Sequence, residues 1–247
     1  MALSVTARLG AAGSGLPLWH DGCWGVVRGC TRVSSGCEHC MAEWHCARPP
    51  LVTHGVSRMT PFGPRWTGRV VTHPERLEEP LHIRAPLRLC VAAASDLFHD
   101  ALPAAFLEEV WDVMRRATWH RFVVLTKRPE RMRVFVRDHG APDNVWIGVS
   151  VEDMERARQR VPVLLEVPAR RLWVNAEPLL GPLTLSPWLA ALRWVAAGPE
   201  LGRGARPCRA DWIRVLADEC AAAGVPFWLN EARLDGELRQ QLPVDLR

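Results

Sequence analysis

Short runs of apolar, often β-branched residues recur along the chain and constrain its fold more than any other feature. Six runs are clear, at residues 87–94, 121–126, 145–150, 171–175, 193–197 and 226–230. Two weaker runs cover residues 24–28 and 69–72. Because each run is short and continuously apolar, we interpret the runs as strands buried on both faces, which is typical of parallel sheets.

Stretches with the apolar spacing of helices lie between these runs, at residues 103–120, 129–139, 152–166 and 211–223. Pro103 suits the first position of a helix, and Gly140 suits a helix C-terminus. Pro162 predicts a kink or a stop. Strands that alternate with helices in this way predict βαβ units and a parallel sheet.

The length of 247 residues, with up to eight strands, favours a (β/α) barrel, complete or partial and TIM-barrel-like. A doubly wound open sheet is the alternative. We expect one barrel-like domain over residues 20–247, with a cysteine-bearing loop after the first strand. Residues 1–19 and roughly 45–66 are rich in Gly and Pro and predict irregular structure.

The chain has no apolar run long enough to span a membrane and no basic-then-apolar leader at its start. We therefore expect a cytoplasmic protein with no membrane partner. In the cytoplasm, clustered cysteines bind metals or act as reactive thiols more often than they form disulfides.

Four of the eight cysteines lie between residues 28 and 46, and Cys30, Cys37 and Cys40 have the spacing C-x6-C-x2-C. This spacing leaves two main hypotheses open. The first is a structural zinc site built on the Cys37–Cys40 pair, which needs four ligands. Its remaining ligands would come from Cys30, Cys46, His39, His45 or Cys23. The second is a 4Fe-4S cluster on three thiolates, whose fourth iron is open to an outside ligand such as S-adenosylmethionine. A redox C-x2-C pair is a weaker third hypothesis.

Polar residues follow the predicted strands at their carboxyl ends, where parallel α/β folds place their sites. They are Asp96, Lys127, Ser150 with Glu152, Asn175 with Glu177, Glu200, and Asn230 with Glu231. The composition sharpens this pattern, because the chain has thirty arginines but one lysine and three asparagines. Lys127, Asn175 and Asn230 are thus rare residue types, and all three fall in this set.

Seven collinear segments carry a resemblance to a known family. They are GCTRVSSGCEHC (29–40), SDLFHD (95–100), LTKRPERM (125–132), GVSVED (148–153), AEPLLGPL (176–183), GRGARP (202–207) and LDGELRQQLP (234–243). Over residues 22–243 the chain resembles a phage-associated three-Cys-motif family of unknown function. The cysteines of that family are similar to those of the radical S-adenosylmethionine superfamily. The spacing departs from the superfamily's C-x3-C-x2-C, and His39 stands where an aromatic residue is usual.

The resemblance implies a 4Fe-4S cluster on Cys30, Cys37 and Cys40, with S-adenosylmethionine as co-substrate. It also implies a partner protein that supplies electrons and radical chemistry on an unknown substrate, with nucleic acid of phage or host as the candidate. The alternative is a zinc-stapled, non-radical protein of phage origin that binds nucleic acid or has a structural role. Cys23 and Cys46 are auxiliary ligands or core residues.

We predict catalytic roles for Lys127, Asp96 and Glu177. Asp96 also belongs to a predicted cofactor-binding set with Asn175, Glu200 and Arg206. Each residue has a structural alternative. For Lys127 the alternative is an ion pair with Glu130 or Asp96. For Asp96 and Glu177 it is capping of a turn or pairing with Arg128 and Arg131. For Arg206 it is a solvated arginine in a loop.

Overall fold

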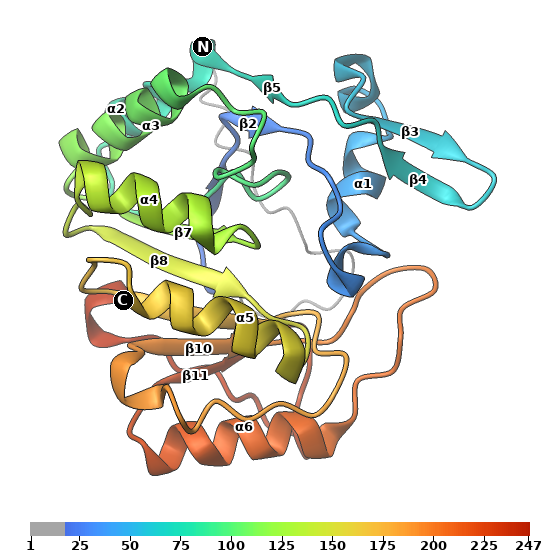
Figure 1. The fold of residues 1–247 in the computed structure, drawn as a ribbon, viewed down its shortest axis with the longest axis vertical. Helices are drawn as coiled ribbons and strands as arrows, with labels where there is room; N and C mark the ends of the chain where they lie inside the picture. Colours follow the sequence, from blue (N-terminus) through green and yellow to red (C-terminus); the bar gives the residue numbers. More distant parts are fainter. Residues whose placement is uncertain (1–17) are drawn as a thin grey trace. The chain divides into compact units, whose positions relative to one another are not determined.

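The computed structural model describes residues 18–247, which form two compact units (Figure 1). The first unit contains His20–Thr126 and Pro142–Val145. The second contains Lys127–Ala141 and Trp146–Arg247, together with residues 18–19. Most of the predicted irregular segment 1–19 lies outside the described residues. One domain over residues 20–247 stays a prediction.

The first unit contains three parallel strands in the order β1 (Gly22–Trp24), β6 (Arg88–Val91) and β7 (Arg121–Thr126). The register aligns Leu89 of β6 with Gly22 on one side and with Phe122 on the other. Helices α2 (Glu79–His82) and α3 (Ala104–Arg116) contact each other in this unit. The buried face of α3 consists of Phe106, Leu107, Val110, Trp111, Val113 and Met114. This face matches the helical spacing of apolar residues in the sequence.

The second unit contains four parallel strands in chain order, β8 (Val145–Ser150), β9 (Leu172–Ala176), β10 (Trp194–Ala197) and β11 (Phe227–Leu229). Its helices are α4 (Pro129–His139), α5 (Met154–Leu165) and α6 (Ala210–Ala222). Helix α5 contacts β9, and α6 contacts β11 (Figure 1).

Large aromatic side chains fill the core of the second unit. Trp173 and Trp194 stack with ring centroids 4.6 Å apart, and Trp19 meets Trp173 edge-on at 5.6 Å. A Cβ atom at Gly148 would lie 2.4 Å from Nε1 of Trp173. Residue 148 must therefore be glycine for β9 to place this tryptophan beside β8.

The expected mixed α/β fold, with parallel strands flanked by helices, is confirmed. Strands β7 and β8 and helix α4 have the predicted bounds, and α4 ends at Gly140, whose φ is 70°. In the part of the chain that the structure describes, no helix is long and apolar enough to cross a membrane.

The two weaker runs were interpreted wrongly as buried parallel strands. Gly25 and Val26 divide residues 24–28 between the end of β1 and strand β2 (Val27–Arg28). Strand β2 pairs antiparallel with β5 (Val71–Thr72), the short core of the run 69–72. Strand β5 has only two residues, and both are half-buried. A run this short does not form a strand that is covered on both faces.

Two prolines differ from their predicted positions. Pro103 precedes the first turn of α3, with an extended ψ of 136°, and does not occupy the first helical position. Pro162 lies inside α5, which continues to Leu165. Because Pro162 is exposed, water can satisfy the backbone carbonyl that loses its intrahelical partner.

Residues 45–66 are more regular than predicted. Helix α1 (Met41–Cys46) and the 3-10 helix η2 (Leu51–His54) precede an antiparallel hairpin of β3 (Ser57–Thr60) and β4 (Gly63–Trp66). The hairpin has no apolar run to reveal it, because its middle is largely exposed. The turn has a local cause, since the Thr60 hydroxyl donates to the carbonyl oxygen of Gly63 at 2.6 Å.

Candidate functional site

The cysteine segment, residues 29–40, joins β2 to α1 in the first unit, and its start is fixed by Gly29. This residue has φ of 91°, and a Cβ atom there would lie 2.1 Å from the carbonyl oxygen of Arg69. Gly29 forms a parallel bridge with Ser95, whose hydroxyl donates to the Gly29 carbonyl. The segment therefore begins beside the residues that follow β6.

The three motif thiols lie along this segment. Cys30 follows Gly29, Cys37 ends the 3-10 helix η1 (Ser35–Cys37), and Cys40 directly precedes α1. All three residues are partly exposed, and none of the eight cysteines, which all lie within residues 18–247, forms a disulfide. Among the described residues, no group of three or more His, Cys, Asp or Glu is arranged to hold a metal ion.

The donor set nevertheless fits a thiophilic group by its chemistry. Thiolates are the usual ligands of zinc and of iron–sulfur clusters, and a nearby cation favours the thiolate form. Arg32 is the cation near the motif thiols, and it is paired with Glu43. Its hydrogen bond to Glu43 raises the pKa of Arg32, and the charges of Cys40 and Cys37 raise this pKa further. Both thiols thus lie within the electrostatic reach of one guanidinium.

An arginine–glutamate pair holds the cysteine segment against α1. Arg32 donates from Nε to Oε1 of Glu43 at 3.0 Å, forms a second ion-pair contact through Nη2, and donates from Nη2 to the carbonyl of Glu38 at 2.7 Å. Glu43 is buried, and its Oε1 also accepts from the backbone N–H of Trp66 at 3.0 Å. The sequence analysis did not predict this pair. Its only sign in the sequence is an acidic residue, Glu43, in the first turn of a short helix.

Two buried polar residues after β6, Asp96 and His99, form hydrogen bonds that fix the neighbouring loops. Asp96 accepts at Oδ1 from the Thr126 hydroxyl at 2.7 Å and from the backbone N–H of Phe98 at 2.9 Å. Nδ1 of His99 accepts from a backbone N–H, which assigns the ring proton to Nε2. Nε2 therefore donates to the Thr31 hydroxyl at 2.9 Å. One oxygen of Asp96 thus stabilises the turn, and His99 anchors the residue after Cys30.

In the second unit the residues that follow three strands meet around one carboxyl group. Asn175 lies in β9, one residue before its end, and donates from Nδ2 to Oε2 of Glu177 at 3.2 Å. Asn230 follows β11 and donates from Nδ2 to the same oxygen at 2.7 Å. A Cβ atom at Gly198, after β10, would lie 3.0 Å from Oε1 of Glu177. The glycine therefore makes room for the carboxyl group.

The surroundings of Glu177 raise the pKa of its carboxyl group. Burial of the carboxyl group raises the pKa of Glu177, while the hydrogen bonds from Asn175 and Asn230 and the charge of Lys127 lower it by less. Among the described residues, Oδ1 of Asn175 and Oδ1 of Asn230 are buried without a hydrogen-bond partner. The cluster thus combines a carboxyl group that can exchange a proton with two unsatisfied acceptors, a combination typical of functional sites.

Three further predicted residues of the second unit, Arg206, Glu200 and Glu152, are engaged in ion pairs. Arg206 donates from Nε to Oε2 of Glu200 at 2.9 Å, and its backbone N–H donates to the same oxygen at 2.9 Å. Glu152 is fully buried and accepts from Nη1 of Arg160 at 2.9 Å. The cofactor-binding role of Glu200 and Arg206 stays a prediction, and Glu152 has a clear structural partner.

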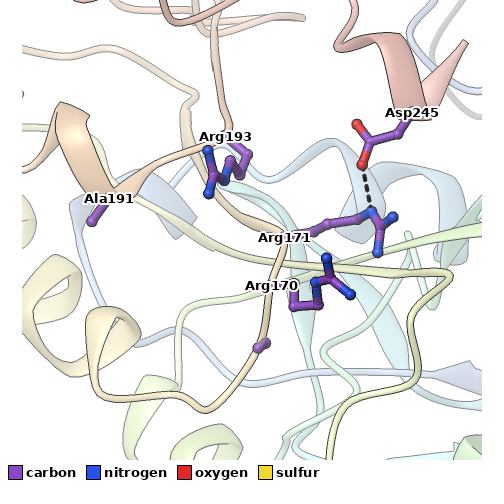
Figure 2. A pocket seen from close by; sticks show the side chains of 6 residues that line it. Arg170, Arg171, Ala191, Arg193 and Asp245 are labelled. Carbon is purple, nitrogen blue, oxygen red and sulfur yellow. Dashed lines mark hydrogen bonds and ion pairs between the residues drawn. The ribbon is translucent and has the colours of Figure 1, made fainter.

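A recess of about 460 Å³ lies elsewhere on the second unit (Figure 2). It is lined by Ala169, Arg170, Arg171, Ala191, Arg193 and Asp245. Arg171 and Arg193 directly precede β9 and β10, so the recess lies at the amino ends of these strands, opposite the cluster around Glu177. Nε of Arg171 donates to Oδ2 of Asp245 at 2.7 Å. Sequence reasoning missed this recess, because surface arginines are too frequent in this chain to form a pattern.

These features define a mixed α/β protein with polar clusters at the carboxyl ends of parallel strands and with a three-thiol segment in its first unit. The chain belongs to the family described as "Protein of unknown function (DUF5131)", whose model matches residues 18–237. Comparison with curated proteins gave no match, and comparison with solved structures gave none either.

The raised pKa of Glu177 predicts a pH dependence of stability. Above its ordinary value of 4.5, the native state holds this proton more tightly than the unfolded state does. The free energy of unfolding should therefore fall as pH rises from 4.5 through the higher native pKa. Glu177→Gln should remove this contribution, which thermal unfolding of both proteins between pH 4 and 8 would measure. The exposed Glu166→Gln is the control, and parallel curves for wild type and Glu177→Gln would contradict the prediction.

Proposed function

We propose that this protein is an iron–sulfur enzyme that cleaves S-adenosylmethionine and acts by radical chemistry on a further substrate. The observation that carries the proposal is the set of three partly exposed thiols, Cys30, Cys37 and Cys40, on one short anchored segment. In this proposal the three thiolates hold a 4Fe-4S cluster and leave one iron open to S-adenosylmethionine. When reduced, the cluster supplies the electron that breaks a carbon–sulfur bond of S-adenosylmethionine.

The residues around the thiols have positioning roles in this proposal. Arg32 and Glu43 join the segment to α1, and the guanidinium of Arg32 lies within the electrostatic reach of Cys37 and Cys40. His99 holds Thr31, next to Cys30. Fixed ligands and a nearby cation both favour binding of an anionic thiolate cluster.

The cluster around Glu177 is proposed to bind a reacting or recognised group. Its two unsatisfied amide oxygens, on Asn175 and Asn230, accept hydrogen bonds, and the carboxyl group of Glu177 gives or takes a proton. Lys127 supplies a positive charge nearby. We further propose that the strands complete a full or partial (β/α) barrel, that a separate protein supplies electrons, and that the family is phage-associated.

The test is metal analysis with electron paramagnetic resonance on anaerobically purified, dithionite-reduced protein, with and without S-adenosylmethionine. We expect about four irons and four sulfides per chain and a reduced-cluster signal that changes when S-adenosylmethionine is added. One zinc per chain without iron would contradict the proposal and favour a zinc-stapled segment.

A second candidate function, binding of nucleic acid, is favoured by the basic recess. Three guanidinium groups and one carboxylate line it, and guanidinium groups bind phosphates well. We expect affinity for a DNA or RNA duplex that falls steeply with salt, and Arg193→Gln should reduce the slope of log affinity against log salt by about 1. The exposed Arg203→Gln is the control. A flat response to salt would rule this function out.

A further inference from the structure

Arg28, the last residue of β2, is a buried cation without an anionic partner among the described residues. Its exposed fraction is 5%, and its Nε has no hydrogen-bond partner there. Its side chain contacts Cys46, but burial raises the pKa of the Cys46 thiol and so favours the neutral form. Among the described residues no carboxylate forms an ion pair with Arg28, and such a buried charge is costly.

A second guanidinium group, that of Arg76, lies beside Gly25 together with that of Arg28. Arg76 ends the 3-10 helix η3 (Pro74–Arg76), and it is buried and bound by Glu79 through two contacts of 2.9 Å. A Cβ atom at Gly25 would lie 3.0 Å from Nη1 of Arg76 and 3.6 Å from Nη2 of Arg28. Both guanidinium groups thus converge on the side of the backbone where residue 25 has no side chain.

Two histidines supply further unsatisfied nitrogens in the same unit. The rings of His54 and His73 lie with centroids 5.0 Å apart. Nδ1 of His54 and Nε2 of His73 are buried and, within residues 18–247, lack a hydrogen-bond partner. The backbone N–H of His73 donates to the carbonyl oxygen of Val26 at 2.8 Å, which places the histidine pair beside β2 and Arg28.

We propose that Arg28, Arg76, His54 and His73 form a binding site for an oxyanion, the carboxylate or phosphate group of a small molecule. Nε and Nη2 of Arg28 form a fork that matches two oxygens of such a group, and Gly25 leaves room for its approach. The bound anion neutralises Arg28, which no carboxylate of the described chain does. This inference is independent of the iron–sulfur chemistry, because it needs neither a metal nor the motif cysteines.

The competing account is a buried ion pair between Arg28 and a Cys46 thiolate. The two accounts predict different effects of removing the charge. If the site binds an anion, Arg28→Met removes an uncompensated charge, so the anion-free variant should be at least as stable as wild type. If Cys46 is the true partner, Arg28→Met and Cys46→Ser should both destabilise the protein, whatever anion is present.

The experiment is thermal unfolding of the full chain in sodium phosphate, sodium acetate or sodium chloride at matched ionic strength. We expect the melting temperature of wild type to rise with phosphate or acetate concentration beyond the effect of chloride. A response to phosphate alone identifies a phosphate group as the ligand, and a response to acetate identifies a carboxylate. Arg28→Met should weaken the apparent affinity by at least about tenfold.

Gly25→Ala provides a second test that does not remove a charge. Residue 25 has no positive φ, and the added methyl group would meet only the flexible ends of arginine side chains, so the variant should fold. The methyl group should block the approach and weaken the anion response, whereas the exposed Arg58→Met should leave it unchanged. The proposal fails if wild type shows no response beyond that to chloride, or if Arg28→Met and Gly25→Ala both keep the wild-type response.

Discussion

Replacing Glu152 with glutamine should lower the free energy of unfolding by about 3–5 kcal/mol, because it leaves a buried charge without its counterion. Glu152 is fully buried and accepts from Nη1 of Arg160 at 2.9 Å. The same nitrogen donates to the carbonyl of Ser150 at 2.8 Å, and the backbone carbonyl of Glu152 accepts from Leu180 at 2.8 Å. The side-chain pair therefore connects α5 to the end of β8, and the backbone of Glu152 also contacts the segment after β9.

Urea unfolding followed by tryptophan fluorescence measures this loss. The control is Glu155→Gln on α5, where an exposed carboxylate lies 3.3 Å from Nη2 of Arg156. Its effect should stay within about 0.5 kcal/mol, because exposed ion pairs contribute little. The double variant Glu152→Gln, Arg160→Met should be more stable than Glu152→Gln alone, since it removes both charges. Equal effects of Glu152→Gln and Glu155→Gln would contradict the argument.

Glu152 also illustrates why a polar residue after a strand is ambiguous in sequence. The acid follows β8 by two residues, much as Glu177 directly follows β9, so position alone does not separate a structural acid from a site residue. Its partner is eight positions away on α5 and is one of thirty arginines, so no sequence pattern distinguishes Arg160 from the others. Burial and pairing reveal its structural role.

The elements that could be predicted from the sequence are the strands that are buried on both faces, because most of their residues must be apolar. Strands β7 and β8 are buried along almost their whole length, so their apolar runs mark their exact bounds. The hairpin of β3 and β4 shows the opposite case. Met59 is 55% exposed, so the strand has no continuous apolar signal, and pairing across a short turn determines it.

The cluster around Glu177 was predictable because parallel register brings strand ends together. Ala197 of β10 pairs with Ala176 of β9 and with Leu229 of β11, so the residues after these strands form one row. Asn230 and Glu177 meet in that row. Gly198 was not predictable as a site residue, because its role depends on the distance to a side chain of a neighbouring strand.

The cysteine segment was visible in sequence only through its thiols. Spacing identifies Cys30, Cys37 and Cys40, but it carries no information on what holds them. Glu43 binds the segment from a helix, and Ser95 binds it from a region more than sixty residues away. Long-range contacts of this kind between polar groups have no periodicity, so they emerge only from the structure.

Substitution of the motif cysteines should lower the amount of bound iron and sulfide more than any other substitution in the chain. Under the proposed function, Cys30→Ser, Cys37→Ser and Cys40→Ser should each reduce bound iron and sulfide from about four per chain to near zero, because a cluster with two protein ligands is poorly held. Iron and sulfide assays on anaerobically purified variants would measure the loss. Cys208→Ser is the matched control, since Cys208 is also partly exposed but lies in the second unit.

Cys46→Ser decides whether the proposed cluster has an open iron. Cys46 is fully buried, and burial raises the pKa of its thiol, so we expect it to stay neutral and the variant to keep its iron and sulfide. If Cys46→Ser also loses iron, a fourth protein thiolate closes the cluster, and S-adenosylmethionine has no iron to bind. If only Cys30, Cys37 and Cys40 are needed, the count of three ligands leaves one coordination site for a small molecule, which is the property that radical cleavage requires.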